Sequence, residues 1–253
     1  MALFTDGTIS SIADLTDQDS SLLDLSDTEA LNLTTKLALA KEEVGIELIS
    51  LLERSRSGRL GGQPVSNLNQ IVVTPPLRLW HTFQALSLVY RDAYYSQLND
   101  RYREKWVEYK SQARWARTKL LEMGVGIVLN PVPRADAPAL TMIAATGTGG
   151  NYYVRVTLLN AQGEEGAPST VVPTVVPDGH VLSIELGGTS PNVRNWNAYV
   201  GIDPADVQLQ NGSPLAIGST WVYSAMTAQA GRNPGSGQAP NFVRPLPRLL
   251  QRG

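Results

Sequence analysis

The sequence contains no cysteine and only two histidines, His81 and His180. The absence of cysteine excludes disulfide bonds, thiolate zinc sites, iron–sulfur clusters and a cysteine nucleophile. Two histidines are too few for a three-histidine metal site. Neither histidine has a recognisable nucleophile partner. We expect His81 on the polar side of a helix and His180 after the turn Pro177-Asp178-Gly179, both at the surface.

The sequence also lacks long apolar runs and a strong net charge. Its apolar runs fall short of the roughly 18–20 residues that span a bilayer, and the first residues lack the basic and apolar regions of a secretory signal. We therefore expect no membrane association. A net charge of −2 is unlike that of a protein that wraps nucleic acid. With 42% apolar residues among 253, the chain can build one large domain or two small ones.

Motifs for catalysis and cation binding are incomplete. Asp17-Gln18-Asp19-Ser20 begins like a calcium loop, but Leu22 occupies the required glycine position and Thr28 the bidentate acid position. The run Gly147–Gly150 lacks the lysine of a phosphate-binding loop. The adjacent carboxylates Glu164-Glu165 are expected in a hairpin tip, where they do not face each other across a cleft. The sequence therefore predicts no enzyme, no metal and no cofactor.

The first half of the sequence has the periodicity of helices. Ser26 and Glu29 form a capping box, after which apolar residues recur at spacings of three to four until Arg56. A second helix begins at Thr74-Pro75, an N-cap followed by proline at the first helical position. A third helix, with an aromatic stripe, ends at Gly124. These patterns predict an α-helical bundle.

The helices also carry apolar residues opposite, or well away from, their main stripes. At 100° per residue, a helix of a small monomeric bundle is polar on that side. We predict that these residues lie at subunit interfaces, and the alternative is packing against the glycine-rich loop of residues 57–70. The predicted interface residues are Leu39, Ile46, Leu88, Tyr95 and Trp115.

Four basic residues of the third helix fall within a sector of about 60°. Such a stripe is suited either to face the phosphates of DNA in a channel or to form ion pairs with acidic neighbours. No aromatic residues interleave with it in the manner of a single-strand binder. The stripe consists of Arg103, Lys110, Arg114 and Arg117.

The second half of the sequence switches to a period of two. Strands are expected at residues 153–158, 181–186 and 196–201, and an edge strand at 171–176, because Pro173 cannot donate to a ladder. Short strands at this spacing predict an antiparallel β-sandwich of roughly 90 residues. The fold class is therefore α+β and multidomain, with helices first and strands second.

The predicted parts are an acidic arm over residues 1–25, a helical bundle over 26–130, a β-sandwich over 138–230 and an extended tail over 231–253. A proline-rich linker joins the bundle to the sandwich. Residues 1–35 contain acids and no base, whereas the last stretch, from residue 207, contains arginines and no acid. Opposite charge at the two ends is typical of ring-forming or partner-docking tails, and also of two solvated termini.

The helical half resembles a known protein family. Residues 80–94 (WHTFQALSLVYRDAY) and 100–109 (DRYREKWVEY) resemble the helical bundle of head-to-tail adaptor (connector) proteins of tailed bacteriophages. The resemblance covers about residues 25–130 and lies in the pattern of helices and aromatics. In the second half, residues 152–169 and 195–201 are similar to strands and a turn of a fibronectin type III or immunoglobulin-like domain, a kind of domain that often decorates phage structural proteins.

The adaptor resemblance implies a structural virion protein that forms a homo-oligomeric ring, usually of twelve subunits, in the phage neck. Its partners would be its own copies, the portal protein and tail or nozzle proteins. Double-stranded DNA would pass through its channel without sequence recognition. The protein would be made in the bacterial host cytoplasm and reside in the virion. The alternative is a phage-borne adhesion or carbohydrate-binding module on a helical oligomerisation stalk, in which Trp196 and Trp221 stack on sugars instead of filling a core.

The C-terminal segment from residue 241 has the composition of a docking peptide. Pro245 and Pro247 disfavour a long helix, while apolar anchors alternate with arginines that bind carboxylates. The family resemblance names the portal ring as the acceptor, and the alternative is that the tail folds back on its own sandwich. The predicted docking residues are Phe242, Val243, Arg244, Leu246, Arg248, Leu249, Leu250 and Arg252.

Overall fold

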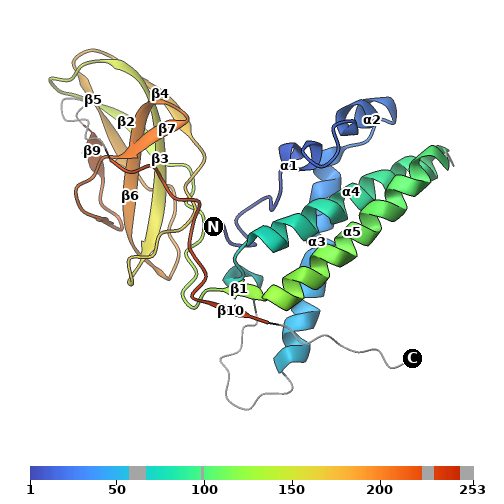
Figure 1. Ribbon diagram of the computed structural model, residues 1–253. Helices are drawn as coiled ribbons and strands as arrows, with labels where there is room; N and C mark the ends of the chain where they lie inside the picture. The colour runs from blue at the N-terminus through green and yellow to red at the C-terminus, as the bar shows by residue number, and fades with distance from the viewer. Residues whose placement is uncertain (57–66, 98–99, 224–230, 246–253) are drawn as a thin grey trace. The chain divides into compact units, whose positions relative to one another are not determined.

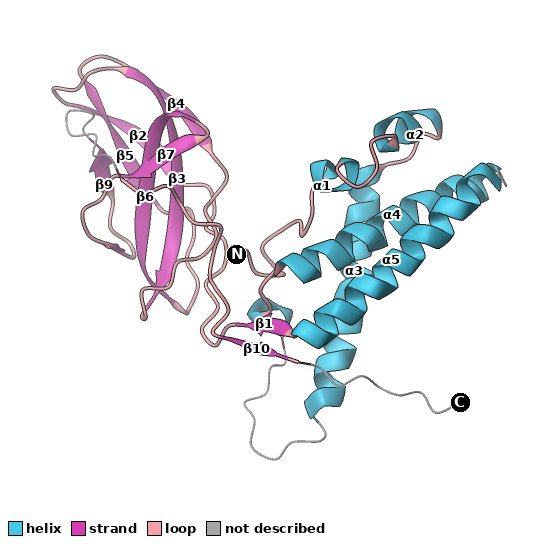
Figure 2. Cartoon of the chain, viewed as in Figure 1, coloured by secondary structure: helices cyan, strands magenta, loops and turns pink. Residues whose placement is uncertain are grey.

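A computed structural model describes residues 1–56, 67–97, 100–223 and 231–245, and shows an α+β protein of helices and antiparallel sheets (Figures 1 and 2). This agrees with the predicted fold class at that level. The side chains of residues 54–56 and 97 also lie outside the description.

The chain forms two compact units, and it crosses between them three times. The helical unit consists of Gly7–Ile127 together with the segment from Pro240, and the β unit consists of Met1–Asp6 together with Val128–Ala239. The chain ends therefore do not form a separate arm and tail. The first six residues belong to the β unit, and the segment after Ala239 belongs to the helical unit. Hydrogen bonds to residues far away in the sequence attach these short segments, and such bonds leave no periodic signal in the sequence.

Long helices dominate the helical unit. Within the described residues, none of the helices is long and apolar enough to span a bilayer. Two short helices, α1 (Ile12–Thr16) and α2 (Leu22–Thr28), lie wholly or partly within the predicted acidic arm. The other helices are α3 (Leu33–Arg56), α4 (Pro75–Gln97) and α5 (Arg103–Met123), with short 3-10 helices at Leu68–Gln70 and Asp100–Tyr102.

Helix ends follow local signals at most positions. The predicted boundaries at Arg56, Pro75 and Gly124 are confirmed. The predicted capping box is wrong, because Ser26 lies inside α2 and its hydroxyl donates to the Leu23 carbonyl at 2.9 Å. The α3 helix instead begins after Asn32, whose side-chain oxygen accepts from the Thr35 N–H at 3.0 Å. Asparagine caps a helix as well as serine does, so the pattern alone allowed both starts.

The α4 helix packs against α5, α3 and α1. Leu77 and Leu88, which lie off its main stripe, are 0% and 3% exposed. The prediction that Leu88 lies at a subunit interface is therefore wrong, because neighbours within the same chain already bury it. A helix covered on several sides is apolar around much of its circumference.

A small antiparallel sheet joins the C-terminal segment to the helical unit. Strand β1 (Val125–Ile127) follows α5 and pairs with β10 (Phe242–Arg244), with Val125 opposite Arg244. The pairing of β10 with β1 requires glycine at position 124. There φ is 101°, and a Cβ would lie 2.6 Å from Cγ1 of Val243. In this structure Phe242, Val243 and Arg244 thus form a strand on the chain's own helical unit. They are neither a free tail nor a segment folded back on the sandwich.

The β unit contains two antiparallel sheets. The three-stranded sheet has the order β2-β5-β9, and the larger sheet has the order β4-β3-β6-β7, with β8 paired to β6. Pro173 lies in β4 at an edge, as predicted. The strands are β2 (Ala139–Ala144), β3 (Gly150–Asn160), β4 (Val172–Val176), β5 (His180–Glu185), β6 (Val193–Asp203), β7 (Asp206–Leu209), β8 (Leu215–Ala216) and β9 (Trp221–Tyr223).

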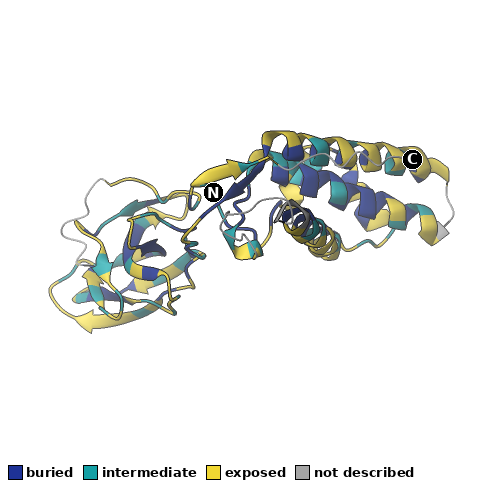
Figure 3. Cartoon of the chain, turned by 90° about the horizontal axis from the view of Figure 1, so that it is seen from below, coloured by how far each residue is buried: buried dark blue, intermediate teal, exposed yellow. Residues whose placement is uncertain are grey.

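One apolar core receives side chains from both sheets, including Val154 of β3, Ile184 of β5 and Trp196 of β6. Val132 and Ala135, which the sequence analysis placed in the linker, are also buried in this core. The β unit therefore begins before residue 138. Figure 3 shows the contrast between such buried residues and the exposed outer sides of the long helices.

Candidate functional site

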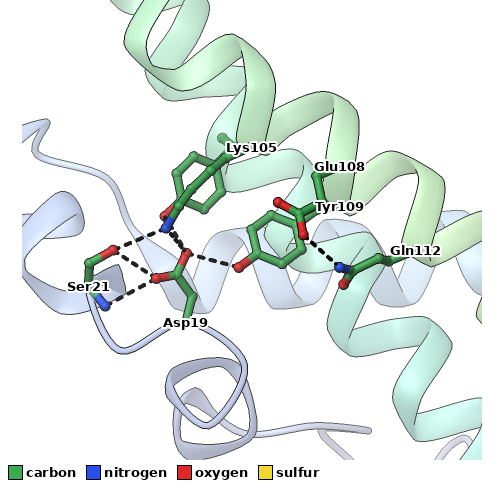
Figure 4. Close-up of polar contacts among 7 residues, drawn as sticks. Asp19, Ser21, Lys105, Glu108, Tyr109 and Gln112 are labelled. Atoms are coloured by element: carbon green, nitrogen blue, oxygen red, sulfur yellow. Dashed lines mark hydrogen bonds and ion pairs between the residues drawn. The ribbon is translucent and has the colours of Figure 1, made fainter.

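The carboxylate of Asp19 is the centre of a buried polar cluster in the helical unit (Figure 4). Asp19 lies between α1 and α2. Its Oδ2 accepts hydrogen bonds from the hydroxyls of Tyr90 at 2.5 Å and Tyr109 at 3.0 Å, and lies 2.8 Å from Nζ of Lys105. Its Oδ1 accepts from the Ser21 hydroxyl and N–H. The cluster ties the loop between the two short helices to α4 and α5.

The protonation states of Asp19 and Tyr109 in this cluster do not change near neutral pH. Burial raises the pKa of Asp19, but the hydrogen bonds from Lys105, Tyr90, Ser21 and Tyr109 outweigh it and hold that pKa well below its usual value. Burial and the bond to the carboxylate raise the pKa of Tyr109. A general acid or base works best with a pKa near the operating pH. These shifts lead away from neutrality, so the cluster is suited to fastening the loop and not to proton transfer.

His81 is buried, not at the surface as predicted, with 1% of its surface exposed. Nε2 lies 3.1 Å from the Leu37 carbonyl, which can only accept, so Nε2–H donates and Nδ1 accepts from the Ser10 hydroxyl at 2.5 Å. A serine–histidine contact resembles part of a nucleophilic pair, but Ser10 is itself buried and no carboxylate orients the ring. The contact instead joins the N-terminal segment to α3 and α4.

We expect His81 to make the helical unit labile to acid. Burial lowers the pKa of His81 from 6.5 to about 4, so the unfolded chain takes up a proton before the folded one does. The contribution of neutral His81 to the free energy of unfolding is therefore fully present above pH 6.5. The free energy of unfolding falls by about 3 kcal/mol as the pH drops to 4. Urea unfolding at a series of pH values measures this slope.

The His81→Gln variant isolates the contribution of the imidazole. The glutamine amide can donate to Leu37 and accept from Ser10, but it does not titrate, so most of the slope between pH 6.5 and 4 should disappear. His180→Gln, in the β unit, is the matched control and should keep the slope of the unaltered chain. An unchanged slope in His81→Gln would show that other groups cause the acid lability.

Four of the five predicted interface residues do point outward. Leu39, Ile46, Tyr95 and Trp115 are between 39% and 70% exposed, which leaves their role in subunit contacts a prediction. The sequence analysis missed two neighbouring residues, Ile49 on α3 and Val107 on α5, which are 38% and 56% exposed. The sequence signal that could have revealed them is their spacing of three to four residues from other exposed residues on the same helix, such as Ile46 and Ile49 on α3.

The four basic residues that the sequence analysis placed in one sector of α5 have different surroundings. Arg103, Lys110 and Arg114 are exposed, whereas Arg117 forms an ion pair with Glu47 of α3 in the same chain. Nζ of Lys110 lies 5.5 Å from the ring centroid of Trp106. This single contact does not contradict the expectation that aromatic residues do not interleave with the stripe in the manner of a single-strand binder.

Trp106 belongs to an aromatic group at the ends of α4 and α5. It stacks on Tyr94, with ring centroids 5.8 Å apart, and meets the edge of Tyr95 at 5.7 Å. This group forms only when α4 and α5 pack, because its members come from two helices. The sequence periodicity of α5 alone therefore did not reveal it.

Glu165 in the β unit is largely buried and not in an exposed hairpin tip. Its Oε1 accepts from the Tyr199 hydroxyl at 2.6 Å and from the Asn197 amide at 3.2 Å, and its Oε2 lies 2.8 Å from an Arg232 nitrogen. Burial raises the pKa of Glu165, but these hydrogen bonds, that from Thr157 and the Arg232 charge lower it overall. This carboxylate fastens the segment around residue 232 to the larger sheet.

The two tryptophans considered as sugar platforms lie in the core or against it. Trp196 is 0% exposed and its indole N–H donates to the Ala216 carbonyl at 3.0 Å, while Trp221 packs against the core of the β unit. The alternative that they are core residues is confirmed for Trp196, whereas Trp221 is partly buried at the edge of the core. Trp196 therefore has no exposed face on which a sugar ring could stack.

The predicted docking residues are only partly placed. Phe242 and Val243 in β10 are 40% and 49% exposed, and Arg244 is half-buried. The other predicted docking residues lie outside the described part of the chain, namely Leu246, Arg248, Leu249, Leu250 and Arg252.

Among the residues that the structure describes, no group of three or more histidine, aspartate or glutamate side chains comes together in a way that could hold a metal ion. Comparisons with protein-family models, with curated proteins and with solved structures found no match for the chain. The functional argument therefore depends on the surfaces of the two units.

Proposed function

We propose that the chain is a structural virion protein that forms a homo-oligomeric ring in the neck of a tailed bacteriophage and joins the portal to the tail. The exposed apolar surface of the helical unit carries this proposal. Ile46, Tyr95, Val107 and Trp115 are between 53% and 70% exposed. Burying a large apolar side chain is worth roughly 1.5–3 kcal/mol, so contacts between copies that cover these residues would stabilise an assembly.

The resemblance of residues 80–94 and 100–109 to connector proteins supports this kind of assembly. The first segment lies within α4, and the second runs through the short 3-10 helix into α5. From the resemblance we infer about twelve copies, with the portal and tail or nozzle proteins as neighbours. The ring would surround DNA that passes through without sequence recognition, and the protein would act in the virion.

We further propose that the β unit is an immunoglobulin or fibronectin type III-like sandwich. The larger sheet, β4-β3-β6-β7, has the order of strands C′-C-F-G in such domains, and the pair β2–β5 matches strands B–E. The chain also visits these strands in the corresponding sequence. The main departure from that topology is in the smaller sheet. Its third strand, β9, comes late in the chain and pairs with β5, whereas strand A of such domains comes first in the chain and pairs with strand B.

The alternative, a carbohydrate-binding module on a helical stalk, has less support because Trp196 lies in the core and Trp221 packs against it. Glycan-array binding by the purified chain separates the two proposals. Strong, selective binding to a glycan would favour the alternative. We propose no catalytic activity.

Electron microscopy and native mass spectrometry of the purified chain, alone and mixed with the portal of the same phage, test the proposed function. We expect closed rings of about twelve copies on the portal. Trp115→Glu should block assembly and leave the helical content intact, because Trp115 is 53% exposed in the single chain. Ile202→Glu, at an 80% exposed position of the β unit, is the matched control and should assemble. Failure of the unaltered chain to form rings with the portal would contradict the proposal.

A further inference from the structure

The outer face of α3 carries apolar and acidic residues at the spacing of a helix-packing stripe. Leu39, Glu42, Ile46, Ile49 and Glu53 follow one another at alternating steps of three and four residues. All five are exposed, and Ile46 is 70% exposed. Residues at this spacing form a stripe about four turns long, which is typical of a helix face that packs against another helix. We call these residues the acidic stripe.

The outer face of α5 carries the opposite charge at the same spacing. Arg103, Val107, Lys110 and Arg114 follow at steps of four, three and four residues. All four are exposed, with Val107 56% exposed between the cations. The aliphatic stems of arginine and lysine can cover apolar side chains while their charged ends reach carboxylates. We call these residues the basic stripe.

From this match we propose that the acidic stripe of one copy packs against the basic stripe of the next copy. At 1.5 Å per residue the stripes are about 21 Å and 17 Å long, so they can lie along each other. Ile46 and Ile49 would contact Val107 and the stems of its basic neighbours. Glu42 and Glu53 would pair with the cations. This inference rests on the proposed function and deepens it, because it names one pair of surfaces that meet in the ring.

The two stripes cannot meet within one chain. The acidic stripe lies on the side of α3 opposite its buried residues, such as Val44 and Leu48, so it faces away from α5. The basic stripe lies on a flank of α5, beside buried residues such as Tyr109 and Ala113. The neighbouring flanks of these helices are already joined by the ion pair between Glu47 and Arg117. A partner for each stripe must therefore come from another molecule.

Charge selects a second copy in a head-to-tail arrangement. Pairing two acidic stripes or two basic stripes would place like charges side by side, which is unfavourable. Pairing unlike stripes joins two different surfaces, and such a heterologous contact forms a closed ring when the rotation between neighbours closes. The observed distribution of charge thus favours a ring over a two-fold dimer.

Two charge-reversal variants test the interface. The first is Glu42→Lys with Glu53→Lys, and the second is Arg103→Glu with Arg114→Glu. Each alone should lose at least about tenfold in the affinity between copies, because attraction becomes repulsion. Mixed in equal amounts, the two variants should form rings again, since each altered stripe meets an altered stripe of opposite charge. Native mass spectrometry should then find both variants in equal numbers.

A variant with the same change in net charge as the first of these is its control. Asp27→Lys with Glu185→Lys alters two exposed acids outside the stripes and should assemble like the unaltered chain. Assembly of either stripe variant alone, or a mixture that does not assemble, would overturn the interface while leaving the proposed ring in place. An unaltered chain that forms no ring even with the portal would overturn the proposed function and the interface together.

Discussion

Replacing Asp19 with alanine should lower the free energy of unfolding of the helical unit by about 3 kcal/mol. The hydroxyls of Tyr90 and Tyr109 would lose their acceptor inside the unit, and Lys105 would lose its counter-charge. Leaving buried polar groups without partners costs more than the bonds themselves contribute. Urea unfolding followed by circular dichroism at the helical band measures the loss.

Asp27→Ala, at an exposed position of α2, is the matched control and should change stability by less than about 0.5 kcal/mol. The pH dependence gives a second check. Because the pKa of Asp19 is lowered, its contribution is present above the usual aspartate pKa and is lost as the pH falls below about 4. The difference between Asp19→Ala and the unaltered chain should therefore shrink there. Equal stability of the two chains at pH 7 would show that the cluster does not fasten the loop.

Replacing Trp196 with alanine should destabilise the β unit by about 3–5 kcal/mol. This indole is fully buried in the core that both sheets share, and its removal would leave a large cavity and break the hydrogen bond from the indole N–H to the Ala216 carbonyl. The helical unit has its own core, so its circular dichroism signal should persist while the β unit unfolds at lower temperature. Thermal unfolding followed at both the helical and the strand bands measures the effect.

Trp115→Ala is the matched control, because it removes the same side chain from an exposed position on α5. It should leave the stability of the single chain nearly unchanged and weaken only assembly. A Trp196→Ala variant that keeps its stability but loses binding to a glycan would contradict the core role and favour the carbohydrate-binding alternative.

Several interactions of the helical unit could not be predicted from one stretch of sequence. Asp19 lies in a segment that only partly matches a calcium loop, and its partners on α4 and α5 are 71 to 90 residues away. The same holds for His81, whose contacts to Ser10 and Leu37 lie 71 and 44 residues away. Periodicity reports the local phase of a helix. It does not report how many neighbours cover that helix, which is why His81 and Leu88 were placed outside the core.

The sequence by itself determined the elements whose signals are local. Proline at position 75 and glycine at 124 set helix ends, because one lacks an N–H and the other adopts positive φ. Alternation of apolar residues set the strands, and Pro173 set an edge. Only the tertiary structure decided where the chain ends belong. The Asn241 N–H donates to the Ile127 carbonyl at 2.9 Å, and the Arg134 N–H donates to the Asp6 carboxylate at 2.9 Å. Both bonds join residues that are far apart in the sequence. Such pairing depends on which surfaces the folded units offer, and no short-range pattern encodes it.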